Sequence, residues 1–322
     1  MGETIERIAL EEHFRVPNMS EYSGARQYIS DNAAAEYMDD RLADFDDLRL
    51  QAMDEANVTR AILSHTVPGL GATMDRKKAV DDAIKINDFL AGNIARHPDR
   101  FGGFATLPMQ SAPDAAKELE RCVKQLGFHG ALINGHTNGH YLDEDQYEVF
   151  WERVAVLDVP IYIHPTLAWQ TPQNYQDHPE LAAAIWGWAP ETATHILRLL
   201  FAGLFDRFPT LQIIAGHGGE CLPYFLWRFD SRFKIFNFGK RLKKPPSSYI
   251  RENVAITTAG LFSTPPLRCA LEALGDDRVL FSIDYPYESS KEAGDWLNNA
   301  GLTPSTLRKV ASANAKRLLH LQ

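Results

Sequence analysis

The residues that could do chemistry start where the first apolar run ends. Residues 8–10 are apolar, and Glu11, Glu12 and His13 follow them directly. Alternate side chains of a strand share a face, so we expect Glu11 and His13 to point one way and Glu12 the other. A carboxylate and an imidazole on one face offer an oxygen and a nitrogen to a divalent metal ion. Taken alone, a charged strand end that meets solvent explains this segment more simply, so the later strand ends decide the interpretation.

Polar side chains of the same kinds stand at the ends of several later apolar runs. A single histidine after a strand is more often a hydrogen-bonded structural residue, and a single aspartate there is more often a helix cap or a turn former. A coincidence of several such residues is harder to explain in that way. The strand-end residues are His65, Asn134, His136, His164, His217, Glu220 and Asp284.

Eight apolar runs alternate with helical patterns along the chain, and this alternation predicts a parallel sheet. Eight such units in 322 residues favour an α/β fold, a closed (β/α)8 TIM barrel in one domain spanning residues 1–322, with a polar insertion at residues 15–40. An open doubly wound sheet is the alternative, although no G-x-G-x-x-G motif follows the first strand. After a first strand that ends at residues 11–13, the expected strands are residues 60–65, 101–107, 128–134, 159–164, 211–215, 253–258 and 278–282. The expected helices are residues 44–57, 75–97, 113–126, 147–157, 192–205, 222–233, 266–274 and, in several pieces, 291–319.

A barrel of this type carries its catalytic groups at the C-terminal ends of the strands. Glu11, His13, His164 and Asp284 would therefore converge on one mouth of the barrel. Carboxylate and imidazole ligands without a thiolate suit zinc, manganese or magnesium. The pattern predicts one divalent metal ion at this mouth.

The composition narrows the classes of partner and the compartment. The chain is 45% hydrophobic with a net charge of −9, which argues against nucleic acid or an anionic membrane as a partner. The three cysteines, Cys122, Cys221 and Cys269, are widely spaced and odd in number, which favours reduced thiols and a cytoplasmic location. The N-terminus shows no signal-peptide pattern, and no apolar run approaches the roughly 20 residues of a membrane span.

Six motifs distributed over nearly the whole chain form a specific set. They are ALEEHF at residues 9–14, HPDRF at 97–101, DVPIYIHP at 158–165, GHGGE at 216–220, WR at 227–228 and FSIDYPYE at 281–288. With these motifs the chain resembles the amidohydrolase superfamily, and within it the nonoxidative aromatic-acid decarboxylases. Members of that branch act on γ-resorcylate, 2,3-dihydroxybenzoate, salicylate or 5-carboxyvanillate.

The resemblance implies an enzyme of aromatic compound catabolism that decarboxylates an ortho-hydroxybenzoate to the phenol and carbon dioxide, a reaction that could also run in reverse. A metal ion, with no organic cofactor, would hold the substrate carboxylate and the adjacent phenolic oxygen. A proton would then be delivered to the ring carbon that loses the carboxylate. Relatives are dimers or tetramers, so we expect a homodimer or homotetramer.

The resemblance also assigns roles to individual residues, and positions at strand ends add further substrate-binding candidates. The expected metal ligands are Glu11, His13, His164 and Asp284; the expected catalytic residues are Asp284, His217 and Glu220; the expected substrate-binding residues are Arg228, His65, Asn134 and His136.

The chain departs from its relatives in the expected wall of the pocket. Relatives often carry arginine at the position of Thr166, and polar residues at the positions of Ala259 and Leu261. These differences leave the substrate open but keep the expected metal site. Two other functions remain as alternatives. One is hydrolysis of a lactone, amide or ring-cleavage product with Asp284 as general base, and the other is ligand binding by a barrel without catalysis.

Overall fold

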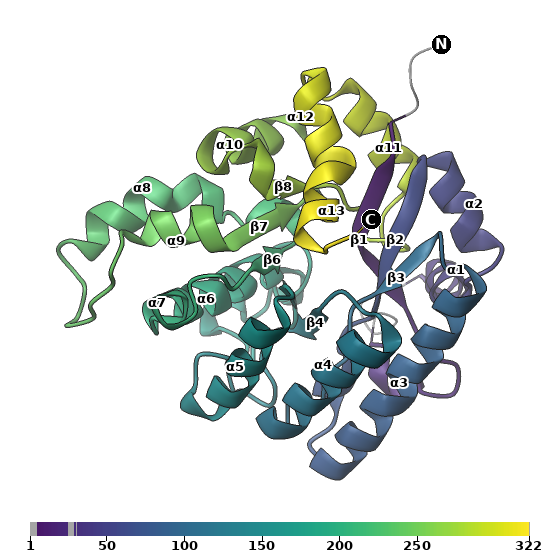
Figure 1. Cartoon of the computed structure of the whole chain (residues 1–322), viewed down its shortest axis with the longest axis horizontal. Helices are drawn as coiled ribbons and strands as arrows, with labels where there is room; N and C mark the ends of the chain where they lie inside the picture. Colours follow the sequence, from purple (N-terminus) through teal and green to yellow (C-terminus); the bar gives the residue numbers. More distant parts are fainter. Residues whose placement is uncertain (1–4, 25–28, 30, 322) are drawn as a thin grey trace.

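A computed structural model describes residues 5–24, 29 and 31–321 of the chain. Within these residues, parallel strands form a central ring that helices surround (Figure 1). The strands are β1 (Arg7–Phe14), β2 (Val58–His65), β3 (Phe101–Gly103), β4 (Ala131–Asn134), β5 (Ile161–His164), β6 (Ile213–Ala215), β7 (Val254–Thr257) and β8 (Val279–Leu280). They form two hydrogen-bonded sheets, one of β1 to β3 and one of β4 to β8.

Two isolated bridges close these sheets into a barrel. Between β3 and β4, the amide of Ala105 donates to the carbonyl of Gly130 over 2.9 Å. Between β8 and β1, the amide of His13 donates to the carbonyl of Tyr285 over 2.7 Å. The expected (β/α)8 barrel is therefore confirmed, and the alternative of an open sheet does not apply.

The helices keep the expected order but differ at several ends. They are α1 (Asn32–Ala43), α2 (Leu48–Glu55), α3 (Arg76–Arg96), α4 (Ala112–Leu126), α5 (Glu148–Leu157), α6 (Trp188–Phe201), α7 (Leu204–Arg207), α8 (Leu222–Phe233), α9 (Pro246–Asn253), α10 (Thr264–Leu274), α11 (Ser290–Asn299), α12 (Pro304–Arg308) and α13 (Asn314–Leu318). Gly127 ends α4 with a left-handed φ of 73°, as expected for a glycine after a helix. Gly203, with φ of 75°, divides the expected helix at residues 192–205 into α6 and α7. Helix α9 was not predicted.

The polar insertion after β1 contains a short 3-10 turn, Ser20–Tyr22, and helix α1. Residues 25–28 and 30 of this insertion lie outside the described part of the chain. Among the residues that are described, no helix has both the length and the apolar character that crossing a bilayer requires.

Apolar side chains fill the part of the barrel interior nearer the start of the strands. They form a buried cluster separate from the larger core between strands and helices. Because this cluster plugs one end of the barrel, the polar residues at the C-terminal ends of the strands face a mouth at the other end. The strand residues of the plug are Ile8, Leu10, Ile62, Leu132, Tyr162, Ile214, Ala255 and Leu280.

Strand β1 contains a bulge that changes which of its residues face the interior. Its register with β2 shifts between Ala9 and Glu12, so Leu10 and Glu11 together oppose one residue of β2. Strict alternation from Leu10 would turn Glu12 inward, whereas the bulge turns Glu11 and His13 inward and Glu12 outward. The predicted faces of these residues are therefore confirmed, but for a reason that alternation alone does not give.

Candidate metal centre and active site

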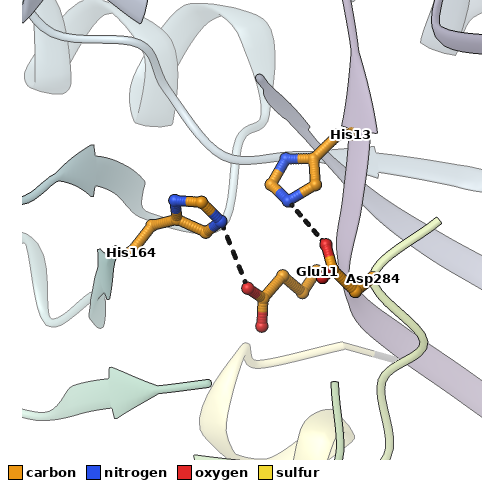
Figure 2. A group of neighbouring side chains, drawn as sticks. All are labelled: Glu11, His13, His164 and Asp284. Atoms are coloured by element: carbon orange, nitrogen blue, oxygen red, sulfur yellow. Dashed lines mark ion pairs between the residues drawn. The ribbon is translucent and has the colours of Figure 1, made fainter. Parts of the chain in front are cut away.

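Four side chains meet at the C-terminal mouth of the barrel (Figure 2). Glu11 and His13 come from β1, His164 ends β5, and Asp284 follows β8. One ligand atom of each lies within 4.8 Å of those of the others. Figure 2 shows His164 facing Glu11, with Nε2 3.3 Å from Oε1, and His13 facing Asp284, with Nε2 3.2 Å from Oδ1. The structure thus brings together the whole set of residues expected to hold the metal ion.

The chemistry of these groups fits a cation between them. The carbonyl of Pro165 lies 2.9 Å from Nδ1 of His164 and can only accept, so Nδ1 carries the hydrogen. Burial, followed by the charge of His13, lowers the pKa of His164 well below its ordinary value, which leaves a lone pair on Nε2. That lone pair faces Oε1 of Glu11, a buried atom without a hydrogen-bond partner among the described residues. Two facing acceptors are stabilised by a positive ion between them, and a divalent metal supplies it.

Side chains below the cluster orient two of its members. The phenol of Tyr162 donates to Oε2 of Glu11, and Nδ1 of His13 lies 3.3 Å from the hydroxyl of Ser64. The contact with Ser64 leaves Nε2 of His13 directed toward the cluster. Neither Tyr162 nor Ser64 was predicted. Tyr162 stands two residues before His164 on the same face of β5, and this spacing is the signal that could have identified it.

Burial and neighbouring imidazoles set the charge of the two carboxyl groups. Burial raises the pKa of Glu11 to about 7. Burial also raises the pKa of Asp284, but the neighbouring imidazoles of His13 and His217 outweigh it and lower that pKa to about 2. The negative charge of the cluster therefore lies mainly on Asp284, and a bound cation would favour the charged form of Glu11 as well.

His217 and Glu220 lie beside the cluster on a left-handed turn. The turn has positive φ at five successive residues: 47° at His217, 68° at Gly218, 80° at Gly219, 51° at Glu220 and 66° at Cys221. A left-handed conformation costs roughly 1–2 kcal/mol for each residue that is not glycine, and such strain clusters at functional sites. The turn runs through both glycines of the GHGGE motif and includes three residues that are not glycine.

The turn directs both nitrogens of His217 to carboxylates. Nδ1 lies 2.8 Å from Oε1 of Glu220, and Nε2 lies 3.6 Å from Oε1 of Glu11 and 3.7 Å from Oδ2 of Asp284. Burial lowers the pKa of His217, but the charges of Glu11 and Glu220 raise it by more, to well above its ordinary value. His217 is therefore placed to carry a proton beside the metal ligands.

His65 and Asn134 end two strands on one side of the mouth. The carbonyl of Thr66 lies 3.1 Å from Nδ1 of His65, and burial lowers the pKa of this histidine to about 4, so the ring is neutral. Asn134 pairs with His164 in the register of β4 and β5. Nε2 of His65 and Oδ1 of Asn134 are buried and lack a hydrogen-bond partner within the described residues. Both residues stay candidates for substrate binding.

The other two substrate-binding candidates lie in different surroundings. His136 engages both ring nitrogens, because Nε2 lies 3.0 Å from the carbonyl of Leu167 and Nδ1 accepts from the amide of Gly139 over 3.3 Å. These contacts join the loops that follow β4 and β5. Arg228 is exposed on α8, where it lines an apolar hollow. It makes no hydrogen bond or ion pair with any residue that the structure describes.

Sequence and fold are both similar to those of characterised proteins. The profile of the family described as Amidohydrolase matches residues 11–321. The γ-resorcylate decarboxylase of Rhizobium radiobacter is 42% identical over 324 residues, which cover 98% of each chain. The crystal structure of 2,6-dihydroxybenzoate decarboxylase complexed with 2,6-dihydroxybenzoate superposes with a TM-score of 0.93 at 40% identity, covering 98% of this chain and 100% of that chain. The dihydroxybenzoic acid decarboxylase of Polaromonas sp. JS666, with bound manganese and the inhibitor 2-nitroresorcinol, has a TM-score of 0.93 at 40% identity, covering 98% of this chain and 97% of that chain.

Proposed function

Because the chain belongs to the amidohydrolase family, we propose that it is a metal-dependent carboxy-lyase that converts an ortho-hydroxybenzoate to a phenol and carbon dioxide. The observation that carries the proposal is the buried cluster of Glu11, His13, His164 and Asp284, whose facing acceptors fit a divalent ion. Similar proteins of the same length decarboxylate dihydroxybenzoates, and one of them binds manganese. Zinc and magnesium suit the same donor atoms.

The first task of the protein in the reaction is to bind the metal ion and to orient the side chains that hold it. The four cluster residues would hold the ion, which supplies positive charge to stabilise negative charge developing on the substrate oxygens. Tyr162 and Ser64 keep Glu11 and His13 in place for this task. His65 and Asn134 offer unpaired buried atoms to a polar substituent of the substrate.

Proton transfer to the ring is assigned to Asp284. Because the resting site holds Asp284 as a carboxylate, a proton has to reach it during turnover. Nε2 of His217 lies 3.7 Å from Oδ2 of Asp284 and is placed to deliver that proton, while Glu220 fixes the other ring nitrogen. Protonation of the carbon that bears the carboxylate interrupts aromaticity, and loss of carbon dioxide restores it.

The wall after β7 favours substrates with few polar substituents. Leu261 lies at the turn that carries His217, close to Gly218, and Ala259 is buried. An unpaired buried hydroxyl costs about 1–3 kcal/mol, so a substrate hydroxyl facing this wall would be disfavoured. We expect monohydroxylated or alkylated salicylates to compete well with γ-resorcylate. Specificity constants across such a series measure this, and a strong preference for γ-resorcylate over every monohydroxy acid would contradict it.

The reaction class is tested by isotope labelling. Turnover in deuterated water should place one deuterium at the carbon that lost the carboxylate. The variant Asp284→Asn should lose turnover, whereas His217→Asn should retain the metal and slow the reaction by roughly 10²–10⁴-fold. Oxygen from labelled water in a product carbonyl, with no carbon dioxide released from any hydroxybenzoate, would identify a hydrolase and overturn the proposal.

A second copy of the chain is the proposed partner of the outer face of α8. A hollow of about 450 Å³ is lined there by phenylalanines, and Phe236 and Phe238 are 57% and 92% exposed. Apolar patches of this kind are typical of protein interfaces. Arg228 and Lys240 also line the hollow, and a second copy with a net charge of −9 offers acidic groups to pair with them. Arg228, which the resemblance places near the substrate, would then lie at the interface of a homodimer or homotetramer.

The assembly is tested by measuring molar mass with light scattering. The double variant Phe236→Asp/Phe238→Asp should be monomeric, whereas Val156→Asp, which changes a residue 73% exposed on α5, should keep the wild-type mass. A wild-type protein that is monomeric at high concentration would contradict the assembly.

A cytoplasmic location is proposed separately, because all three cysteines are free thiols.

A further inference from the structure

The seam between β8 and β1 is closed by side chains as much as by backbone pairing. Among the described residues the two segments share a single isolated bridge, between Glu12 and Tyr285. Two backbone hydrogen bonds accompany it, one from His13 to Tyr285 and one from Asp284 to Glu11. Three of the four cluster residues therefore belong to one of the two seams of the barrel that an isolated bridge closes.

The hydroxyl of Ser282 binds both backbone amides of the bulge in β1. Its Oγ accepts from the amide of Leu10 over 2.9 Å and from the amide of Glu11 over 2.6 Å. Ser282 is fully buried. A bulge takes residues out of the regular ladder, so its amides need another acceptor. Ser282 supplies that acceptor at the residue where Glu11 turns toward the mouth.

Glu12 makes the reverse contact, from a side chain of β1 to the backbone after β8. Its Oε1 accepts from the amide of Ile283 over 3.0 Å, next to Asp284 in the chain. Glu12 is buried, and its carboxylate binds this amide and does not join the metal cluster. The side chain of Ser282, after β8, thus fixes the backbone at Glu11, and the side chain of Glu12, in β1, fixes the backbone next to Asp284.

We propose that Ser282 and Glu12 are positioning residues that set the affinity of the site for its metal ion. They touch neither the ion nor the substrate. Two backbone segments carry Glu11, His13 and Asp284. Ser282 and Glu12 hold these segments in the register that turns the three side chains inward. Ligands held in place before binding bind a metal more tightly, because less conformational freedom is lost on binding. This inference rests on the proposed metal-dependent function.

The test is a titration of metal-free protein with manganese, in which electron paramagnetic resonance measures the concentration of free ion at each point. Ser282→Ala and Glu12→Ala should each raise the dissociation constant roughly 10–100-fold, as losses of supporting hydrogen bonds around metal ligands do. Glu12→Gln keeps an oxygen acceptor for the amide of Ile283 and should restore affinity close to wild type. Should Ser282→Ala fail to fold, Ser282→Cys, which keeps a weaker acceptor, takes its place.

A matched control separates positioning from a general loss of stability. The buried side chain of Asn253 donates to the carbonyls of Pro209 and Leu211 over 2.9 and 2.8 Å, at the other end of the barrel. Asn253→Ala should lower the melting temperature but leave manganese affinity unchanged. If Ser282→Ala and Glu12→Ala lower the melting temperature to the same degree and bind manganese as tightly as wild type, the inference is wrong and the proposed function stands. If the wild-type protein itself binds no divalent metal, the proposed function fails, and the inference with it.

Discussion

Removal of the Tyr162 hydroxyl should weaken metal binding without moving the backbone. The phenol of Tyr162 donates to Oε2 of Glu11 and also lies 3.0 Å from Oγ1 of Thr257. Thr257 itself lies 3.4 Å from the same carboxylate oxygen. Tyr162 is fully buried, so phenylalanine fills the same space and leaves Glu11 with one long contact in place of two.

The magnitude follows from the strength of that hydrogen bond. Hydrogen bonds to charged groups contribute about 1.5–3 kcal/mol, and each 1.4 kcal/mol changes an equilibrium constant about tenfold. Tyr162→Phe should therefore raise the dissociation constant for manganese roughly 10–100-fold, the range typical of residues that support metal ligands. Calorimetric titration of the metal-free protein measures the change directly, and kcat at saturating manganese should fall much less than the affinity.

A second tyrosine–carboxylate pair provides the control. The phenol of Tyr249 donates to Oδ1 of Asp206 over 2.5 Å, on the helices outside the barrel. Tyr249→Phe removes the same kind of hydrogen bond and should leave the affinity for manganese at the wild-type value. Equal affinities for wild type, Tyr162→Phe and Tyr249→Phe would refute the reasoning, because Glu11 would then keep its orientation without the phenol.

Replacing Cys221 by glycine should raise the free energy of unfolding by about 1 kcal/mol in urea titrations, because its φ of 66° strains any other residue, and kcat should not change. His195 is buried with a pKa lowered to about 3, so the folded state binds fewer protons than the unfolded state below pH 6.5. Stability should be complete above pH 6.5 and fall toward pH 3 by at most about 1.4 kcal/mol per unit, and His195→Gln should flatten this slope in denaturant titrations. Removing the metal with a chelator should lower the melting temperature, and manganese at about 100 times its dissociation constant should restore about 2.7 kcal/mol. A melting temperature insensitive to chelator would contradict a bound metal.

The sequence was informative wherever a local pattern determines position. Alternation of apolar runs with helical patterns predicted the barrel, because each strand must bury both faces and each helix one. The same logic placed Glu11, His13, His164 and Asp284 at one mouth, since the C-terminal ends of parallel strands meet there.

Contacts between distant segments were harder to predict. The bulge in β1 depends on the hydroxyl of Ser282, about 270 residues away in the chain, and no local pattern encodes that contact. His136 stands just after a strand, like the metal-binding candidates, yet its ring nitrogens join two loops. Gly203 divides a predicted helix because a single residue with positive φ overrides an otherwise helical pattern. That the whole chain forms one domain stays a prediction.

The bulge in β1 also bears on how this sequence can change over evolutionary time. A point substitution in β1 alters one side chain and leaves the inward or outward direction of all others intact. Loss of a single residue after the bulge, such as Glu12, would instead exchange inside for outside in the rest of the strand and turn His13 away from the mouth. The number of residues between the apolar run and the acidic pair therefore determines which side chains reach the mouth. Strand β1 should tolerate substitutions far better than insertions or deletions.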